Sequence, residues 1–162
     1  MITLVLGGAR SGKSAIGERL VSRCAPPITY VATATATDED MAARIAAHRA
    51  RRPAQWTTVE VGSDLPGALA SVEGSVLLDA LGTWVAGVAD FAVDVEGLRA
   101  ALAARRGDTV IVSDEVGLGV HPPTDAGRRF RDVLGDVNQA VSEVADEVLL
   151  AVAGRVLRLE AG

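Results

Sequence analysis

The chain has few of the features that mark secreted, membrane-bound or nucleic-acid-binding proteins. It has one cysteine, Cys24, in 162 residues, so no disulfide can form within the chain, which suits a reducing compartment. The first 20 residues include glycines, Arg10 and Lys13 where a signal peptide would be apolar. No apolar run reaches the roughly 18 residues that cross a bilayer. The formal net charge of -5 argues against a general nucleic-acid or anionic-lipid surface. We therefore predict a cytoplasmic protein that binds no nucleic acid and spans no membrane.

Lysine is almost absent, since only one of the 16 Lys and Arg residues is lysine, at position 13. Classical GTPase switches recognise guanine through an Asn-Lys-x-Asp segment, and the chain has no second lysine to form one. The sequence therefore argues against a classical GTPase switch. Apolar residues, by contrast, make up 49% of the chain, and we find neither an internal repeat nor a low-complexity linker. This composition predicts one globular domain over residues 1–162.

Short aliphatic or β-branched runs alternate with segments of helical period, which is the pattern of an α/β protein with a mostly parallel sheet. Near-continuous apolarity in several runs predicts strands that are buried on both faces. Thr124 is the predicted N-cap of the last helix, and a turn at Gly154 predicts a C-terminal antiparallel hairpin. The strands are predicted at 2–6, 28–33, 57–61, 76–79, 109–113, 148–152 and 156–159, and the helices at 13–23, 38–51, 95–105 and 125–145.

A glycine-rich loop stands between the first predicted strand and the first predicted helix. It matches G-x-x-x-x-G-K-[ST] in the strand-loop-helix context that this pattern requires. Its glycines let successive N–H groups converge on phosphate oxygens, and the start of the helix adds partial positive charge. Lys13 would reach the β and γ phosphates, and the Ser14 hydroxyl would ligate Mg²⁺. We therefore predict nucleoside triphosphate binding, with small-molecule kinase activity as the simplest function, by Gly7, Gly8, Ala9, Arg10, Ser11, Gly12, Lys13 and Ser14.

A phosphate-loop domain also needs an acidic residue at the end of a strand to hold Mg²⁺ through its water shell. Asp79 ends the strand predicted at 76–79, and Asp114 and Glu115 follow the strand predicted at 109–113. We favour Asp79 for Mg²⁺ and Glu115 as a partner for the substrate or as a base. The alternative for each is an ordinary carboxylate at the end of a strand.

A basic cluster surrounds His48. Arg44 and His48 lie four residues apart, on one face of the predicted helix, and Arg49, Arg51 and Arg52 follow. One interpretation is a solvated helix end. The other is that the arginines bind phosphate and lower the pKa of the imidazole, so that a neutral ring nitrogen attacks a nucleotide phosphorus and forms a phosphoramidate.

Several motifs in the same order resemble the bifunctional adenosylcobinamide kinase / adenosylcobinamide-phosphate guanylyltransferase family. The resemblance spans nearly the whole chain. It rests on residues 7–14, 30–33, 38–53 and 114–119, and it continues through 129–132, 138–139 and 145–148.

This resemblance implies a RecA-like P-loop fold, assembly as a homotrimer, and two reactions. Adenosylcobinamide is phosphorylated with ATP or GTP, and GMP from GTP is then passed through a histidine to adenosylcobinamide phosphate. By position in the motif that histidine is His48, whereas His121 lies before two prolines and does not match. The resemblance also implies nucleotide contacts at Thr33, Ala34, Thr35, Arg49, Ala50, Arg51, Arg52, Glu60 and Asp79.

The chain departs from the family pattern at two positions. Ala80 stands where cysteine is expected, and Asp114 stands where asparagine is common. Two other functions stay open. One is a P-loop kinase for another small hydroxyl-bearing metabolite, in which His48 only binds phosphate. The other is a nonenzymatic interaction module that is controlled by a bound nucleotide.

Overall fold

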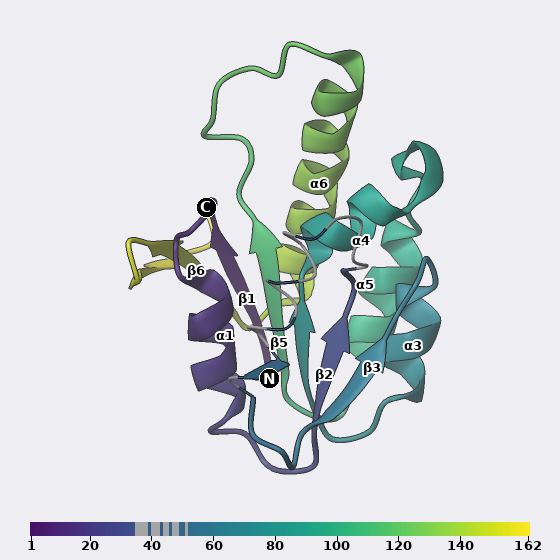
Figure 1. Ribbon diagram of the computed structural model, residues 1–162, viewed down its shortest axis with the longest axis vertical. Helices are drawn as coiled ribbons and strands as arrows, with labels where there is room; N and C mark the ends of the chain where they lie inside the picture. The colour runs from purple at the N-terminus through teal and green to yellow at the C-terminus, as the bar shows by residue number, and fades with distance from the viewer. Residues whose placement is uncertain (35–38, 40–42, 44–45, 47–48, 51) are drawn as a thin grey trace.

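The strands form one seven-stranded sheet in the order β3-β2-β4-β5-β1-β6-β7 (Figure 1). The computed structural model describes residues 1–34, 39, 43, 46, 49–50 and 52–162. Neighbouring strands are parallel except β6 and β7, which pair antiparallel. The predicted parallel sheet with a C-terminal hairpin is therefore confirmed. The strands are β1 (Ile2–Gly7), β2 (Ile28–Ala32), β3 (Thr57–Glu60), β4 (Ser75–Asp79), β5 (Thr109–Asp114), β6 (Glu147–Val152) and β7 (Arg155–Leu159).

Helices cover both faces of this sheet (Figure 1). One buried cluster joins α1 to the strands through residues such as Ile16, Leu77 and Val112. A second cluster packs the remaining helices on the opposite face, around Leu4 and Ile111. The alternation of strand side chains between the two clusters is the period of two that a parallel sheet imposes. The helices are α1 (Lys13–Val21), α3 (Leu65–Ser71), α4 (Leu81–Gly87), α5 (Val95–Ala104) and α6 (Asp125–Val144), with the short 3-10 turn η1 (Ala89–Phe91).

Gly17 allows α1 to lie directly on the strands. A Cβ atom at this position would stand 2.8 Å from Val112 Cγ2 and 3.1 Å from Leu77 Cδ1, closer than carbon atoms pack in protein interiors. The helix that begins at Lys13 is therefore held at a fixed height above β4 and β5. This packing sets the position of the preceding loop relative to the carboxyl ends of those strands.

Arg105 lies at the amino ends of the strands, next to the residue that precedes β4. Its guanidinium donates hydrogen bonds to the carbonyl oxygens of Leu69 at 2.8 Å, Val72 at 2.7 Å and Gly74 at 2.7 Å. Burial lowers the pKa of Arg105. The side chain thus satisfies backbone acceptors that would otherwise lie partly buried without a donor.

Two helices were not predicted from the sequence, and one predicted helix falls largely outside the described residues. The helices α3 and α4 lie in segments for which the sequence analysis predicts no helix. Of the helix predicted at 38–51, residues 38, 40–42, 44–45, 47–48 and 51 lie outside the described residues. Within it, residues 39, 43, 46 and 49–50 have a helical backbone.

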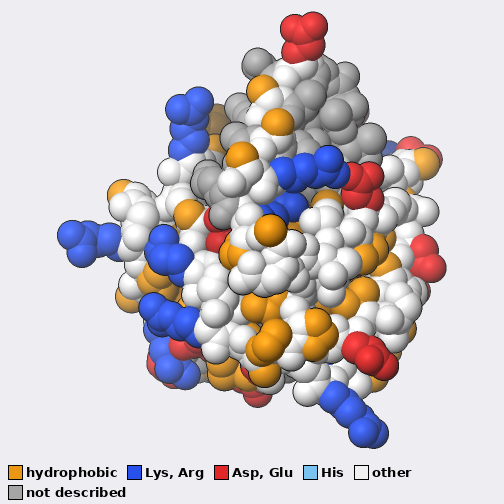
Figure 2. Space-filling model, turned by 60° about the horizontal axis from the view of Figure 1, so that its bottom comes forward, with side chains coloured by type: hydrophobic (Ala, Val, Ile, Leu, Met, Phe, Trp, Pro, Cys, Tyr) orange, Lys and Arg blue, Asp and Glu red, His pale blue; other side chains and the backbone are white. Residues whose placement is uncertain are grey.

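Across the described part of the chain, no helix has the length and apolarity to cross a membrane. On the face shown in Figure 2, Lys and Arg side chains lie along the left side, near the centre and at the lower right, with acidic and apolar side chains between them.

Candidate active site

Three of the predicted site features lie at the carboxyl ends of the parallel strands. The phosphate loop follows β1, Asp79 ends β4, and Asp114 ends β5. In the sheet, β5 lies between β1 and β4. Asp114 therefore lies one strand away from the strand that precedes the loop, and Asp79 lies two strands away. Open α/β sheets bind their ligands at this edge.

The loop has the backbone that the sequence pattern predicts. Gly12 has a left-handed φ of 91°, which a residue with a side chain rarely adopts. A Cβ atom at Gly7 would stand 2.4 Å from Ser11 Oγ, so the start of the loop also needs glycine. Inside the turn, the Ser11 N–H donates to the Gly8 carbonyl at 3.2 Å, and the Gly154 N–H donates to the Ser11 carbonyl at 2.8 Å. The C-terminal hairpin thus braces the loop.

The first turn of α1 is free to face an anion. Gly12, its N-cap, provides no side-chain acceptor for the first N–H groups of the helix. Space opens above Gly8, where an added Cβ would meet nothing within 4 Å. Ala9 and Arg10 are exposed on the loop. Unpaired N–H groups at a helix start, with open space beside them, form an anion-binding arrangement.

Lys13 forms an ion pair that the sequence analysis did not assign. Its Nζ lies 2.7 Å from Asp114 Oδ1 and 3.3 Å from the Gly8 carbonyl oxygen. The β1–β5 register explains this contact, because Gly7 is directly opposite Asp114. Asp114, which we considered for Mg²⁺, instead contacts the lysine that is expected to bind phosphate.

Asp79 lies close to Ser14, as the magnesium prediction requires. Ser14 Oγ is 3.2 Å from Asp79 Oδ1, and the Tyr30 hydroxyl donates to Asp79 Oδ2 at 3.1 Å. Burial and the neighbouring Asp79 carboxylate raise the pKa of Tyr30 well above its usual range, so its hydroxyl keeps its proton. Asp79 itself is only 9% exposed.

The chemistry of this pair fits Mg²⁺. Among the described residues, no group of three or more His, Cys, Asp or Glu side chains could hold a metal ion. Mg²⁺ typically takes one or two protein oxygens and completes its shell with water and substrate phosphates. Ser14 and Asp79 are such oxygens, and they stand at the start of the helix that follows the phosphate loop.

Thr33 connects the end of β2 to the start of α4. Its hydroxyl donates to the Ala80 carbonyl at 2.6 Å and accepts from the Ala80 N–H at 3.0 Å. It also lies 2.6 Å from the Thr83 hydroxyl. Ala34 follows Thr33 and is partly buried, and Thr35 lies outside the described residues. Thr33 therefore fixes the backbone that follows Asp79.

The arginine segment, residues 49–52, is described except for residue 51. Arg49 forms an ion pair with Glu60, which joins two positions implied by the family resemblance. The Arg52 guanidinium carbon lies 3.2 Å from the centroid of the Tyr30 ring, within the range of cation–π contacts. Ala50 is exposed. His48 and Arg51 lie outside the described residues, so their predicted roles stay predictions.

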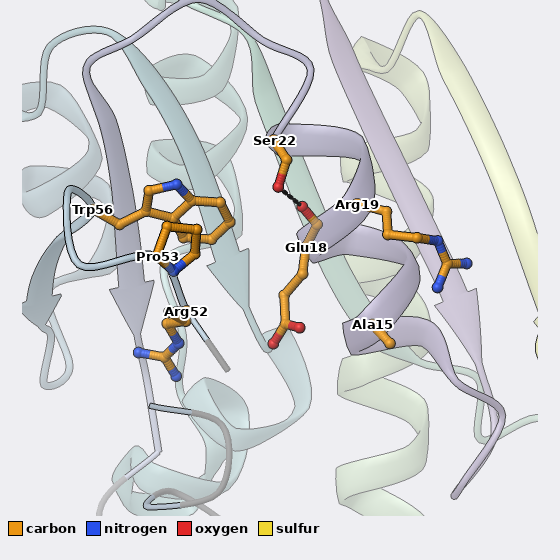
Figure 3. Close-up of a pocket in the computed structure, with 7 residues that line it drawn as sticks. All are labelled: Ala15, Glu18, Arg19, Ser22, Arg52, Pro53 and Trp56. Atoms are coloured by element: carbon orange, nitrogen blue, oxygen red, sulfur yellow. Dashed lines mark hydrogen bonds between the residues drawn. The ribbon is translucent and has the colours of Figure 1, made fainter. Parts of the chain in front are cut away.

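A pocket of about 380 Å³ lies between α1 and the turn that contains Arg52 (Figure 3). Arg52, Pro53 and Trp56 form one side of this pocket. On the other side, Glu18 extends from α1 toward Arg52, whereas Arg19 points to the far side of the helix. The arginine segment is therefore beside the helix that begins at the phosphate loop.

Glu115 holds the loop that follows β5. Its two carboxylate oxygens accept hydrogen bonds from the N–H groups of Gly117 at 2.8 Å and Leu118 at 3.0 Å. It also lines a cavity of about 400 Å³ together with residues of α6 such as Asn138. Its predicted contact with substrate stays a prediction.

Sequence reasoning missed Tyr30 and Asp114 as partners of the predicted site. For Tyr30 a signal existed, since it is the only tyrosine of the chain and precedes Thr33 by three residues. For Asp114 the pairing with Lys13 depends on β5 lying next to β1, and strand order cannot be read from the sequence alone.

The chain matches one protein family and two bifunctional relatives over nearly its whole length. The sequence profile of the family "Cobinamide kinase / cobinamide phosphate guanyltransferase" matches residues 3–159. The "Bifunctional adenosylcobalamin biosynthesis protein CobP" of Pseudomonas aeruginosa is 40% identical over 169 residues, which cover 99% of this chain and 98% of that protein. The "Bifunctional adenosylcobalamin biosynthesis protein CobU" of Salmonella typhimurium is 36% identical over 176 residues, which cover 95% and 97%.

Solved structures share the fold at low sequence identity. The flagellar accessory protein FlaH from Methanocaldococcus jannaschii aligns with a TM-score of 0.53 and 15% identity, over 96% of this chain and 74% of that one. An ATPase of a bacterial type III secretion system aligns with a TM-score of 0.54 and 12% identity, over 92% and 50%. The fold is that of RecA-like P-loop NTPases, as predicted.

Proposed function

Because the chain belongs to the cobinamide kinase / cobinamide phosphate guanyltransferase family, we propose that it catalyses both reactions in adenosylcobalamin biosynthesis. It phosphorylates the aminopropanol hydroxyl of adenosylcobinamide with ATP or GTP. It then transfers GMP from GTP to adenosylcobinamide phosphate and gives adenosylcobinamide-GDP. The observation that supports this most is the meeting of the phosphate loop, the Ser14–Asp79 pair and Arg52 at one edge of the sheet.

In the kinase step, the phosphate loop stabilises charge on the triphosphate. The acceptor hydroxyl oxygen bonds to the γ phosphorus, the bond from that phosphorus to the β–γ bridging oxygen breaks, and the hydroxyl proton is lost to a base or to water. Main-chain N–H groups of residues 8–14 and the Lys13 ammonium face the charge that develops. Mg²⁺, when bound by Ser14 and Asp79, adds positive charge beside the phosphates. Glu115 is the candidate for contact with the acceptor.

In the guanylyl-transfer step, a ring nitrogen of His48 attacks the α phosphorus of GTP. A P–N bond forms, the bond to the α–β bridging oxygen breaks, and pyrophosphate leaves. A phosphate oxygen of adenosylcobinamide phosphate then attacks the same phosphorus, and the P–N bond breaks to regenerate the histidine. Arg49, Arg51 and Arg52 would hold phosphate oxygens, and the Arg49–Glu60 ion pair keeps one of these arginines at the end of β3.

The remaining predictions are part of the same proposal. Residues 1–162 act as one nucleotide-binding domain, and the protein assembles as a homotrimer. The edge strand β7 supports self-association, because Val156 and Leu157 are 47% and 60% exposed on it and edge strands tend to pair or to be covered. Sedimentation of the pure protein would measure the assembly. A cytoplasmic location stays a prediction.

Covalent labelling tests the histidine assignment. GTP radiolabelled in its α phosphate should label the wild type through an acid-labile, base-stable bond, and His48→Ala should stay unlabelled. His121→Ala is the matched control, because His121 does not match the family motif, is exposed and lies 2.9 Å from Arg131. Equal labelling of His48→Ala and wild type would refute the assignment. A wild type that phosphorylates its acceptor without any label would favour a kinase in which His48 only binds phosphate.

A further inference from the structure

Tyr30 stands on the same face of the sheet as Asp79. In the β2–β4 register, Tyr30 is opposite Leu77, and Ala32 is opposite Asp79. Residues two apart on a strand share a face, so the Tyr30 ring lies one pleat before the carboxylate, under α1. Tyr30 is 4% exposed, and its hydroxyl donates to Asp79 Oδ2 at 3.1 Å.

Each oxygen of the Asp79 carboxylate has its own partner. Oδ1 is 3.2 Å from Ser14 Oγ, and Oδ2 accepts the hydrogen bond from Tyr30. Contacts on both oxygens restrict rotation of a carboxylate about its last torsion, which is otherwise a soft one. The Tyr30 hydroxyl therefore turns Oδ1 toward the first helical turn after the phosphate loop.

The ring of Tyr30 has a second contact, with Arg52. The guanidinium carbon of Arg52 lies 3.2 Å from the ring centroid. Arg52 Nε is buried and has no hydrogen-bond partner among the described residues. Stacking on the Tyr30 face is thus a contact that holds this guanidinium in place, since cations bind favourably over aromatic faces.

We propose that Tyr30 is a positioning residue for the phosphate chemistry, which orients the Asp79 carboxylate through its hydroxyl and holds Arg52 on its ring. A tyrosine that only fills the core would not need its hydroxyl, and phenylalanine would replace it without cost to function. The inference rests on the proposed function, because it assigns Asp79 to Mg²⁺ and Arg52 to the nucleotide. It extends that function to a residue outside the phosphate loop and the arginine segment.

The test separates the hydroxyl from the ring. Tyr30→Phe removes only the hydroxyl, and Tyr30→Leu removes the hydroxyl and the stacking surface. We measure GTP affinity by calorimetry, with MgCl₂ and with EDTA. For Tyr30→Phe, the gain in GTP affinity from MgCl₂ should fall roughly tenfold, because the free energy of a hydrogen bond to a charged group corresponds to at least such a change. Its affinity for GTP in EDTA should stay within about twofold of wild type. Tyr30→Leu should also lose affinity in EDTA, because Arg52 loses its platform.

Ser75→Ala is the matched control. Ser75 lies on the same strand as Asp79 but at the other end, and its buried hydroxyl donates to the Ala25 carbonyl at 2.6 Å. It should keep the full magnesium gain although it too loses a buried hydroxyl hydrogen bond. A Tyr30→Phe protein with the wild-type magnesium gain overturns the inference. A wild type that binds no GTP overturns the proposed function, and the inference with it.

A spectroscopic readout tests the contact without activity. Because the chain has one tyrosine, tyrosine labelled with ¹³C at Cζ gives a single NMR signal. Adding MgCl₂ to the GTP complex should shift this signal, since the hydroxyl is bonded to the carboxylate that is proposed to hold the ion. In Asp79→Asn the magnesium-dependent shift should be lost. If the chemical shift of the wild-type signal does not change with MgCl₂, under conditions where MgCl₂ tightens GTP binding, the inference is contradicted.

Discussion

Replacing Asp114 by asparagine should make the protein bind GTP more tightly. In the structure the Asp114 carboxylate lies 2.7 Å from Lys13 Nζ, and this lysine is expected to bind the β and γ phosphates. The nucleotide must therefore displace the carboxylate or share the lysine with it. Asparagine has the same shape without the charge, so Asp114→Asn removes the competitor and leaves the loop intact.

The size of the effect follows from the exposure of the pair. Solvent-exposed ion pairs contribute roughly 0.2–1 kcal/mol, and here the Lys13 side chain is 14% exposed and the Asp114 side chain 34%. We therefore place the pair at about 1 kcal/mol, which corresponds to roughly a fivefold change in an equilibrium constant. The substitution also removes repulsion between the carboxylate and the triphosphate, which acts in the same direction. Roughly fivefold is therefore the lower limit of the expected gain in GTP affinity.

The assay is the affinity for GTP, measured by calorimetry with EDTA and at low and high salt. Asp108→Asn is the matched control. It makes the same change in charge at a residue whose side chain is 38% exposed and pairs with the N-terminal ammonium at 3.0 Å. Asp114→Asn should bind GTP about fivefold more tightly than Asp108→Asn, with a smaller difference at high salt. Equal or weaker affinity in Asp114→Asn would refute the idea that the pair competes with phosphate.

Three further substitutions have outcomes that the contacts decide. Lys13→Ala should reduce both reactions by at least about 100-fold, as loss of a preorganised charge does, and full kinase turnover would argue against a shared triphosphate site. Gly17→Ala should lower the free energy of unfolding by about 1–3 kcal/mol in urea, because its Cβ would meet Val112 Cγ2 at 2.8 Å. Arg105→Met should lower it by about 3 kcal/mol, because carbonyls such as that of Gly74 lose their donor. An unfolding midpoint equal to wild type in either variant would contradict these accounts.

The sequence was sufficient for the strands because each one is a short apolar run between turn residues. Every predicted strand lies within one residue of the observed one at each end. The helix α6 was predictable for a related reason, since its apolar residues recur at steps of three and four and Thr124 accepts the hydrogen bond of a helix cap. Local pattern and tertiary burial agree in these segments.

The helices α3 and α4 were not predictable in this way. Each has seven residues, too few to show a helical period. In α4, buried Leu81, Trp84 and Val85 leave little polar face to define an orientation. Their helical state depends on packing, of α3 against α5 and of α4 against α6 and β5.

The site was predictable to the extent that it is local in sequence. Residues 7–14 form one continuous motif, and Asp79 ends a recognisable strand. The contacts of Lys13 with Asp114 and of Tyr30 with Asp79 depend on which strands are neighbours. Strand order is a property of the folded chain, so residues that are distant in sequence become partners only in the structure.

Product analysis tests the proposed function most directly. Wild-type protein is incubated with adenosylcobinamide, GTP and MgCl₂, and the corrinoid products are identified by mass spectrometry. The account predicts that adenosylcobinamide phosphate appears first and adenosylcobinamide-GDP accumulates after it. Adenosylcobinamide recovered unchanged, while the protein binds GTP, would contradict the account.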